Sequence, residues 1–203
     1  MKTATEKYDA QSDAWSERAY ADSASYLAHR AATILRLGPE LDEGDTLLDL
    51  ACGDGGLADF LPPWLTYLGV DASGPMVAAA RVHGRDVVHG DLNGYVPPQP
   101  VAATTCFRAI YYARDRRAFF ARVRSYTERK FVFDLNPRQY RPADIAADLR
   151  AAGFEHLAVR PFFAPQRVRL PAPVAAGLRA LEGTGPLARL LLRVRFTYVC
   201  AAS

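Results

Sequence analysis

The chain has 203 residues, half of them hydrophobic, which suffices for one domain with a buried core but not for a second large domain. Lysine and arginine number 25 against 22 aspartates and glutamates, and the resulting net charge of +3 is too small to indicate a polyanionic partner. No basic run interleaved with aromatic residues occurs, so we expect no specific nucleic-acid binding.

The cysteines and histidines suggest neither a disulfide framework nor a metal site. Cys52, Cys106 and Cys200 stand far apart, at spacings that fit neither a zinc site nor a set of disulfides. The four histidines, at positions 29, 83, 89 and 156, form no metal-binding pattern, so no metal is expected. The N-terminus lacks a signal-peptide pattern, and no apolar run is long enough to span a bilayer. These features predict a cytoplasmic protein.

Residues 1–40 predict a helical cap that precedes the main domain. One helix is expected over residues 13–20 and a second over 23–37, where apolar residues recur at helical spacing. Gly38 and Pro39 end the second helix. Tyr8, Trp15 and Tyr20 either close over a bound ligand or pack between the helices, and the sequence leaves both alternatives open.

After residue 40 the pattern changes to short apolar runs that alternate with helical stretches, which is typical of βαβ units and a mostly parallel sheet. Seven strands are expected, over residues 46–50, 66–70, 86–89, 102–107, 131–135, 154–160 and 194–201. Helices are expected between them, over residues 56–61, 75–82, 115–127 and 142–152. Residues 93–100 are too few and too rich in proline for much helix.

Residues 47–58 read LLDLACGDGGLA, a buried strand followed by a glycine-rich turn and a predicted helix. Glycines let a ligand approach the backbone, and a helix N-terminus offers free N–H groups. Gly53, Gly55 and Ala58 also satisfy the G-x-G-x-x-A form of the dinucleotide fingerprint, with Asp71 at about the expected separation. The turn alone therefore fits a dinucleotide, another nucleoside, or no ligand.

Three aspartates separate these alternatives. Asp49 ends the first expected strand, Asp71 ends the second, and Asp91 follows the third. Ligands of open α/β sheets bind outside the carboxyl ends of the strands, so the three carboxylates should line one crevice. They suit a ligand with hydroxyls, an amino group and an exocyclic amine, and they do not suit a pyrophosphate. A sulfonium nucleoside with an amino-acid tail has these groups.

At these residues the chain resembles the class I S-adenosylmethionine-dependent methyltransferases, and the resemblance runs from about Tyr8 to the final strand. DLACGDG at 49–55 is similar to the family's first motif, which usually has glycine where this chain has Ala51. GVD at 69–71 followed by Met76 is similar to the second motif, and GDL at 90–92 to the third. The resemblance implies a single domain over residues 1–203, with a Rossmann-like seven-stranded sheet, helices on both faces and an antiparallel last strand.

The resemblance also implies S-adenosylmethionine as cofactor and S-adenosylhomocysteine as product. The backbone at 51–55 would hold the methionine moiety with Asp49 nearby, while Asp71 would accept hydrogen bonds from the ribose hydroxyls. Met76 would pack on the adenine, unless it is an ordinary core residue, and Asp91 would accept from the exocyclic amine. The implied cofactor-binding residues are Asp49, Ala51, Cys52, Gly53, Gly55, Asp71, Ala72, Met76, Asp91, Leu92 and Phe107.

The acceptor side is expected in the loops after the fourth and fifth strands. Arg108, Tyr111 and Tyr112 are candidates for orienting an anionic or phenolic substrate. Alternatively, Arg108 pairs with Asp134 and merely holds the two loops together. No residue's spacing requires a general base, for which Tyr111, Tyr112 and Asp134 are only candidates. The expected acceptor is an oxygen or nitrogen of a small molecule.

Residues 163–193 connect the last two expected strands, and we expect this segment to form a lid over the crevice. If the sixth strand is parallel to its neighbours and the seventh antiparallel, this segment starts and ends above the crevice. Two short helices are expected, one on each side of Gly183-Thr184-Gly185. The apolar composition with scattered arginines favours an acceptor with an apolar body. Contact with a membrane surface is a second interpretation.

The sequence is also compatible with two rival functions. The G-x-G-x-x-A match favours an NAD(P)-dependent oxidoreductase, but such proteins usually have an apolar residue where Asp49 stands, and the chain has little room for a substrate domain. A non-catalytic protein that binds S-adenosylmethionine is the other rival. The motifs describe only the cofactor half of the site, which many different chemistries share.

Overall fold

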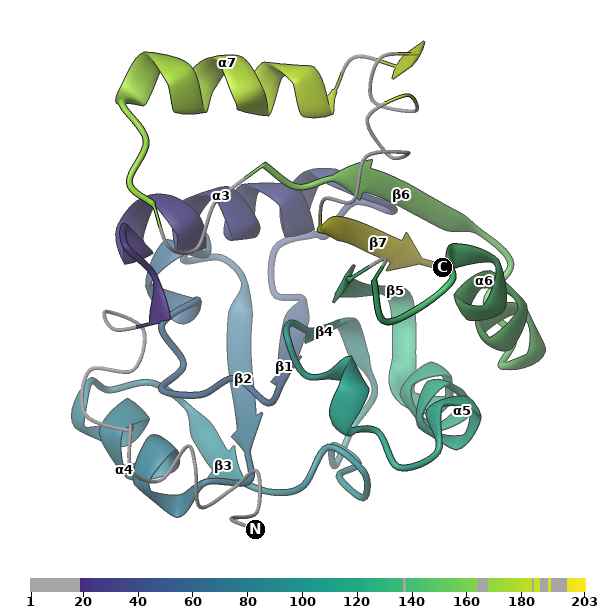
Figure 1. Cartoon of the computed structure of the whole chain (residues 1–203). Coiled ribbons are helices and arrows are strands. Elements are labelled where there is room, and N and C mark those ends of the chain that lie inside the picture. Colours follow the sequence, from purple (N-terminus) through teal and green to yellow (C-terminus); the bar gives the residue numbers. More distant parts are fainter. Residues whose placement is uncertain (1–18, 137, 164–167, 184, 187–189, 191–196) are drawn as a thin grey trace, which may run out of the picture.

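The computed structural model describes residues 19–203 except 137, 164–167, 184, 187–189 and 191–196 (Figure 1). Its centre is a seven-stranded sheet in the order β3-β2-β1-β4-β5-β7-β6. The strands are β1 (Thr46–Leu50), β2 (Thr66–Asp71), β3 (Val87–His89), β4 (Val101–Cys106), β5 (Thr127–Leu135), β6 (Leu157–Pro161) and β7 (Tyr198–Ala202). The first five strands pair in parallel, and β7 is antiparallel to both β5 and β6. The predicted α/β sheet with an antiparallel last strand is confirmed.

The described helices are α3 (Ser23–Arg36), α4 (Gly74–Val82), α5 (Arg116–Tyr126), α6 (Pro142–Ala151) and α7 (Ala172–Glu182), with short 3₁₀ turns η1 (Ala58–Phe60) and η2 (Ile110–Tyr112). Three of them begin at a capping side chain: Asp22, Ser73 and Asp115 accept from backbone N–H groups in the first turns of α3, α4 and α5. Among the described residues no helix is both long and apolar enough to cross a membrane.

Helices cover both faces of the sheet because alternate strand residues point to opposite sides. In β1, Leu47 belongs to the core that packs under α3, with Tyr26 and Ile34. Its neighbour Leu48 belongs to the core on the other face, with Phe120 of α5. The central strand β4 is buried at every position, as expected for a parallel strand covered on both faces.

Several predicted boundaries were wrong. The helix expected over 56–61 is only the 3₁₀ turn η1, because Pro62 and Pro63 follow too soon for an α-helix to complete a second turn. Strand β5 starts at residue 127 instead of 131, directly after α5, and β6 starts at 157 instead of 154. Of the helix expected over 13–20, only residues 19 and 20 lie within the described part of the chain.

The early start of β5 brings a lysine into the core beneath α3. Lys130 is fully buried, and its Nζ donates to the carbonyl oxygens of Leu35 at 3.3 Å and Leu37 at 3.1 Å. These carbonyls lie at the end of α3, where intrahelical partners are missing. Burial lowers the pKa of Lys130 to about 8. The lysine thereby anchors the helix that carries one wall of the functional cavity.

In the segment predicted to be a lid, α7 lies beside α3 (Figure 1). His29 Nε2 contacts both carboxylate oxygens of Glu182, at 3.0 and 2.9 Å. Arg179 Nη2 donates to Ser25 Oγ at 2.5 Å. The helix expected after residue 185 falls largely outside the described residues, and none of the described residues of 163–193 lines the functional cavity. A lid therefore remains a prediction.

Candidate cofactor and acceptor site

A cavity of about 310 Å³ lies at the carboxyl ends of β1, β2 and β4, and beside the residues that follow β3. This is the edge at which open α/β sheets bind ligands, and the volume is at the small end for a ligand pocket. Its lining residues are Tyr20, Arg30, Ala51, Cys52, Gly53, Asp71, Ala72, Ser73, Met76, Gly90, Asp91, Leu92, Asn93, Phe107, Arg108, Ala109, Tyr112 and Arg114.

The turn after β1 has a left-handed backbone at three positions. Gly53 and Gly55 have φ angles of 63° and 69°, which glycine adopts readily. Ala51 also has a positive φ, of 56°. It stands where the resembling family usually has glycine, and the left-handed conformation costs a residue with a Cβ roughly 1–2 kcal/mol. This cost lies in the backbone conformation of Ala51.

Asp71 ties this turn to the start of α4. Its Oδ2 accepts from the Gly53 N–H at 2.7 Å, and its Oδ1 accepts from the Ser73 N–H at 2.9 Å. Because a carboxylate has about four acceptor positions, these two bonds are compatible with further bonds from ligand hydroxyls. Asp71 lines the cavity and is therefore placed both to shape the turn and to contact a ligand.

Asp49 lies beneath the turn and does not line the cavity. Only 3% of its surface is exposed. Thr105 Oγ1 donates to its Oδ1 at 2.6 Å, and Tyr67 Oη donates to its Oδ2 at 3.2 Å. Burial raises the pKa of Asp49 to about 6, against these two hydrogen bonds and the positive charge of Arg30. Asp49 would therefore act on a ligand without touching it, through its charge and through its position directly before the turn.

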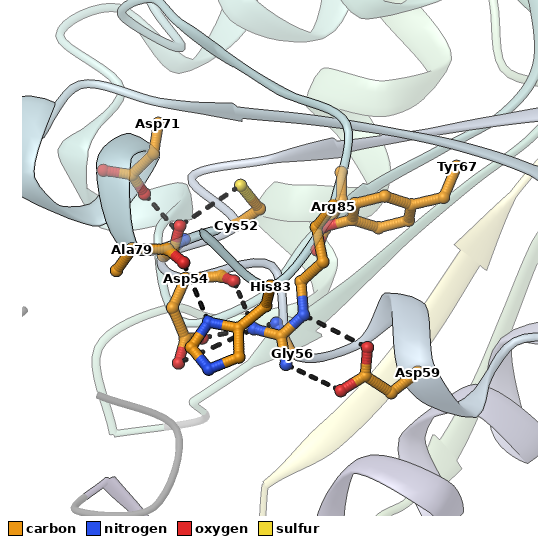
Figure 2. Close-up of polar contacts among 11 residues, drawn as sticks. Cys52, Asp54, Gly56, Asp59, Tyr67, Asp71, Ala79, His83 and Arg85 are labelled. Atoms are coloured by element: carbon orange, nitrogen blue, oxygen red, sulfur yellow. Dashed lines mark hydrogen bonds and ion pairs between the residues drawn. The ribbon is translucent and has the colours of Figure 1, made fainter. Parts of the chain in front are cut away.

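An arginine that the sequence reasoning missed clamps the turn from outside, as Figure 2 shows. Arg85 donates from Nε and Nη2 to the two carboxylate oxygens of Asp59, at 3.1 and 2.6 Å. Its Nη1 donates to the Asp54 carbonyl oxygen at 2.5 Å. A Cβ on Gly55 would lie 3.2 Å from Arg85 Cδ, so Gly55 gives room to this clamp and does not line the cavity.

The wall expected to hold the adenine is partly apolar. Met76 is 1% exposed and lines the cavity, so it belongs to the core and to the cavity wall at once. Ala72 and Leu92 line the same wall. Asp91 accepts from the backbone N–H and the side-chain amide of Asn93, both at 2.9 Å. Although burial opposes it, these bonds hold the pKa of Asp91 below its ordinary value, so the side chain is a charged acceptor.

On the acceptor side, the cavity is lined by Phe107, Arg108 and Tyr112 but not by Tyr111, which is 40% exposed. Arg108 has a left-handed backbone with φ of 56°, and its N–H donates to Asp134 Oδ1 at 2.6 Å. The backbone of Arg108 thus joins the loop after β4 to the end of β5. Its guanidinium lies 5.6 Å from the centre of the Tyr20 ring.

The sequence reasoning also missed Arg30, on α3. Its guanidinium carbon lies 4.4 Å from the centre of the Phe107 ring, and its Nη2 donates to Tyr20 Oη at 3.0 Å. An arginine on an amphipathic helix is normally solvent-exposed, and no local pattern shows that the tertiary fold buries this one. Asn93 and Arg114, which lie in loops and also line the cavity, were missed as well. In the described part of the chain no cluster of three or more metal-binding side chains occurs.

Comparison with known proteins agrees with this geometry. No protein-family model matches the chain. A stretch of 87 residues is 37% identical to an uncharacterised methyltransferase of Schizosaccharomyces pombe, and the match covers 42% of this chain and 30% of that protein. Among solved structures, a chain of the complex between the Haloferax volcanii Trm112 methyltransferase activator and a putative methyltransferase superposes with a TM-score of 0.67 and 19% identity, over 97% of this chain and 96% of that one.

A TehB-like S-adenosylmethionine-dependent methyltransferase from Corynebacterium glutamicum superposes with a TM-score of 0.65 and 15% identity, over 96% of this chain and 98% of that one. This chain has the class I methyltransferase fold. The cavity occupies the expected edge of the sheet, where Asp71 at the end of β2 and Asp91 just after the neighbouring strand β3 line it.

Proposed function

We propose that the chain is an S-adenosylmethionine-dependent methyltransferase that acts on an oxygen or nitrogen of a small molecule. The observation that carries the proposal is the cavity itself. It places the carboxylates of Asp71 and Asp91 beside the left-handed turn at 51–53, within a methyltransferase fold. The hydroxyls, amino group and exocyclic amine of the cofactor would donate hydrogen bonds to acceptors in this cavity, and the adenine would pack against Met76 and Leu92.

The bound cofactor supplies an activated methyl group, and this chain's residues bind and orient the reactants. Asp71 would hold the ribose and Asp91 the adenine amine, while the backbone at 51–53 holds the methionine moiety. Methyl transfer is an in-line displacement, for which proximity and alignment supply much of the rate. A base is needed only if the acceptor arrives protonated, and among the residues after β4 Tyr112 brings a hydroxyl to the cavity wall.

The turn argues against the oxidoreductase alternative. A dinucleotide places its pyrophosphate at the N-terminus of the α-helix that follows the glycine-rich turn. Here the turn runs into the three-residue 3₁₀ turn η1, so the described chain has no α-helix at that point.

The first test is calorimetric titration with S-adenosylmethionine, S-adenosylhomocysteine and NADH, repeated on Asp71→Ala. The control is Asp144→Ala, which removes an exposed carboxylate of α6 that does not line the cavity. We expect both sulfur nucleosides to bind and NADH not to bind, with at least about a tenfold loss in Asp71→Ala only, since two hydrogen bonds to a charged group are removed. Binding of NADH alone, or of no ligand, would overturn the proposal.

Turnover separates an enzyme from a non-catalytic binding protein. The protein is incubated with S-adenosylmethionine carrying a labelled methyl group and a mixture of small metabolites, and the products are examined for labelled methyl. A labelled product that disappears with Asp71→Ala supports an enzyme. Tight cofactor binding with no labelled product from any mixture supports the non-catalytic alternative.

A further inference from the structure

Arg30 is a buried cation in the cavity wall. It is 7% exposed, and its Nη2 donates to Tyr20 Oη at 3.0 Å and Tyr26 Oη at 3.4 Å. Its Nε is buried and has no hydrogen-bond partner among the described residues. No described carboxylate lies within 4.0 Å of its guanidinium nitrogens. The residue lines the cavity, so its buried charge acts directly on a ligand bound there.

Arg108 brings a second guanidinium to the same wall. The Tyr20 ring centre lies 5.8 Å from the guanidinium carbon of Arg30 and 5.6 Å from that of Arg108. Within the described chain, Arg108 also has no carboxylate within ion-pair distance of its guanidinium. By contrast, Arg114 at the other end of the cavity already pairs with Asp91 at 3.3 Å.

Burying a cation without a counter-ion is costly, and the surroundings compensate Arg30 only in part. Cation–π contacts come from Phe107 at 4.4 Å and Tyr26 at 5.0 Å. Asp134 acts on both arginines at longer range, and its carboxylate accepts from the Arg108 backbone. An anion supplied by a ligand would complete this arrangement.

We propose that Arg30 and Arg108 bind a carboxylate of the acceptor, so that the substrate is a small carboxylic acid with an aromatic or apolar body. A planar carboxylate matches the fork of a guanidinium, which can donate two parallel hydrogen bonds. Phe107, Tyr20 and Tyr112 supply the flat apolar wall for the body of the molecule. This assignment deepens the proposed methyltransferase function and rests on it.

The test uses the full chain saturated with S-adenosylhomocysteine and titrated with benzoate, phenylacetate and hexanoate, each against its neutral amide. Arg108→Asn is the main variant, because asparagine tolerates a left-handed backbone and so removes the cation without disturbing the turn. Arg138→Asn is the matched control, since Arg138 is exposed, follows β5 and does not line the cavity. Arg30→Lys keeps the charge but removes the fork.

We expect at least one carboxylate to bind at least about tenfold more tightly than its amide. Arg108→Asn and Arg30→Lys should weaken this binding by about tenfold or more, while Arg138→Asn leaves it unchanged. Equal binding of acids and amides, no carboxylate binding, or full binding by Arg108→Asn would overturn the proposal.

The cofactor also carries a carboxylate, which the two arginines could bind in place of an acceptor carboxylate. A second arm of the experiment distinguishes these two ligands. Each variant is titrated with S-adenosylhomocysteine and with methylthioadenosine, which lacks the amino-acid tail. Unchanged affinity for both supports the acceptor assignment. If the arginine variants lose affinity for S-adenosylhomocysteine alone, the anion is the cofactor's own tail and the proposal is wrong. Failure of the proposed function is seen separately, as wild-type protein that binds no S-adenosylhomocysteine.

Discussion

The buried carboxyl of Asp49 makes a prediction about stability that depends on pH. Burial raises its pKa from 3.8 to about 6 in the folded chain. The folded state therefore holds this proton more tightly than the unfolded state, and the stabilising contribution is lost as the pH rises from about 4 through 6. With about 1.36 kcal/mol per pKa unit, this shift lowers the free energy of unfolding, relative to the fully protonated protein, by roughly 2 kcal/mol at pH 5 and roughly 3 kcal/mol at pH 8.

Asp49→Asn removes this titration and nearly preserves the shape of the side chain. The amide changes the bonds with Thr105 and Tyr67 by an amount that does not depend on pH, so it cancels between two pH values. The free energy of unfolding of the variant minus that of wild type should be larger at pH 8 than at pH 5, by roughly 1 kcal/mol. The assay is urea denaturation at both pH values.

The matched control is Asp144→Asn, an exposed carboxyl, which should show no such difference between the two pH values. A variant-to-wild-type difference that is the same at pH 5 and pH 8 would refute the reasoning, because Asp49 would then titrate alike in the folded and unfolded chains.

Two further substitutions test the turn. Arg85→Met should lower the free energy of unfolding by about 1–2 kcal/mol, since it removes a charged hydrogen bond to the Asp54 carbonyl and a half-exposed pair with Asp59. It should also weaken S-adenosylhomocysteine binding, with Arg85→Lys intermediate in both measurements; wild-type stability and affinity would contradict the clamp. Ala51→Gly should raise the melting temperature, with a net gain of up to about 1 kcal/mol, because relief of the left-handed backbone exceeds the entropy cost of glycine. A lower melting temperature would contradict this prediction, because it would mean that the packing of the Ala51 methyl stabilises the fold by more than its left-handed backbone costs.

Local signals in the sequence predicted much of the sheet and the helix starts. Strand β1 was predicted with its observed bounds, because a short apolar run leads into a glycine turn. The capping residue Ser73 marked the start of α4, since its side chain accepts from the N–H of Met76. The helix expected at 56–61 was wrong, because the glycines before it and the prolines after it leave too few residues to form α-helical hydrogen bonds. The resemblance of the motif to known families gave no information on this length.

The sequence by itself determined the succession of strands along the chain and the three aspartates at or just after the ends of β1, β2 and β3. These depend on periodicity and on the rule that parallel strands end at one edge. Only the tertiary structure placed Arg30 in the cavity, Lys130 under α3 and Arg85 against the turn. Asp59 and Arg85 are 26 residues apart, and Lys130 and Leu37 are 93 apart. Contacts of this kind depend on which elements meet in space, and a charged side chain carries no local pattern that reveals its distant partner.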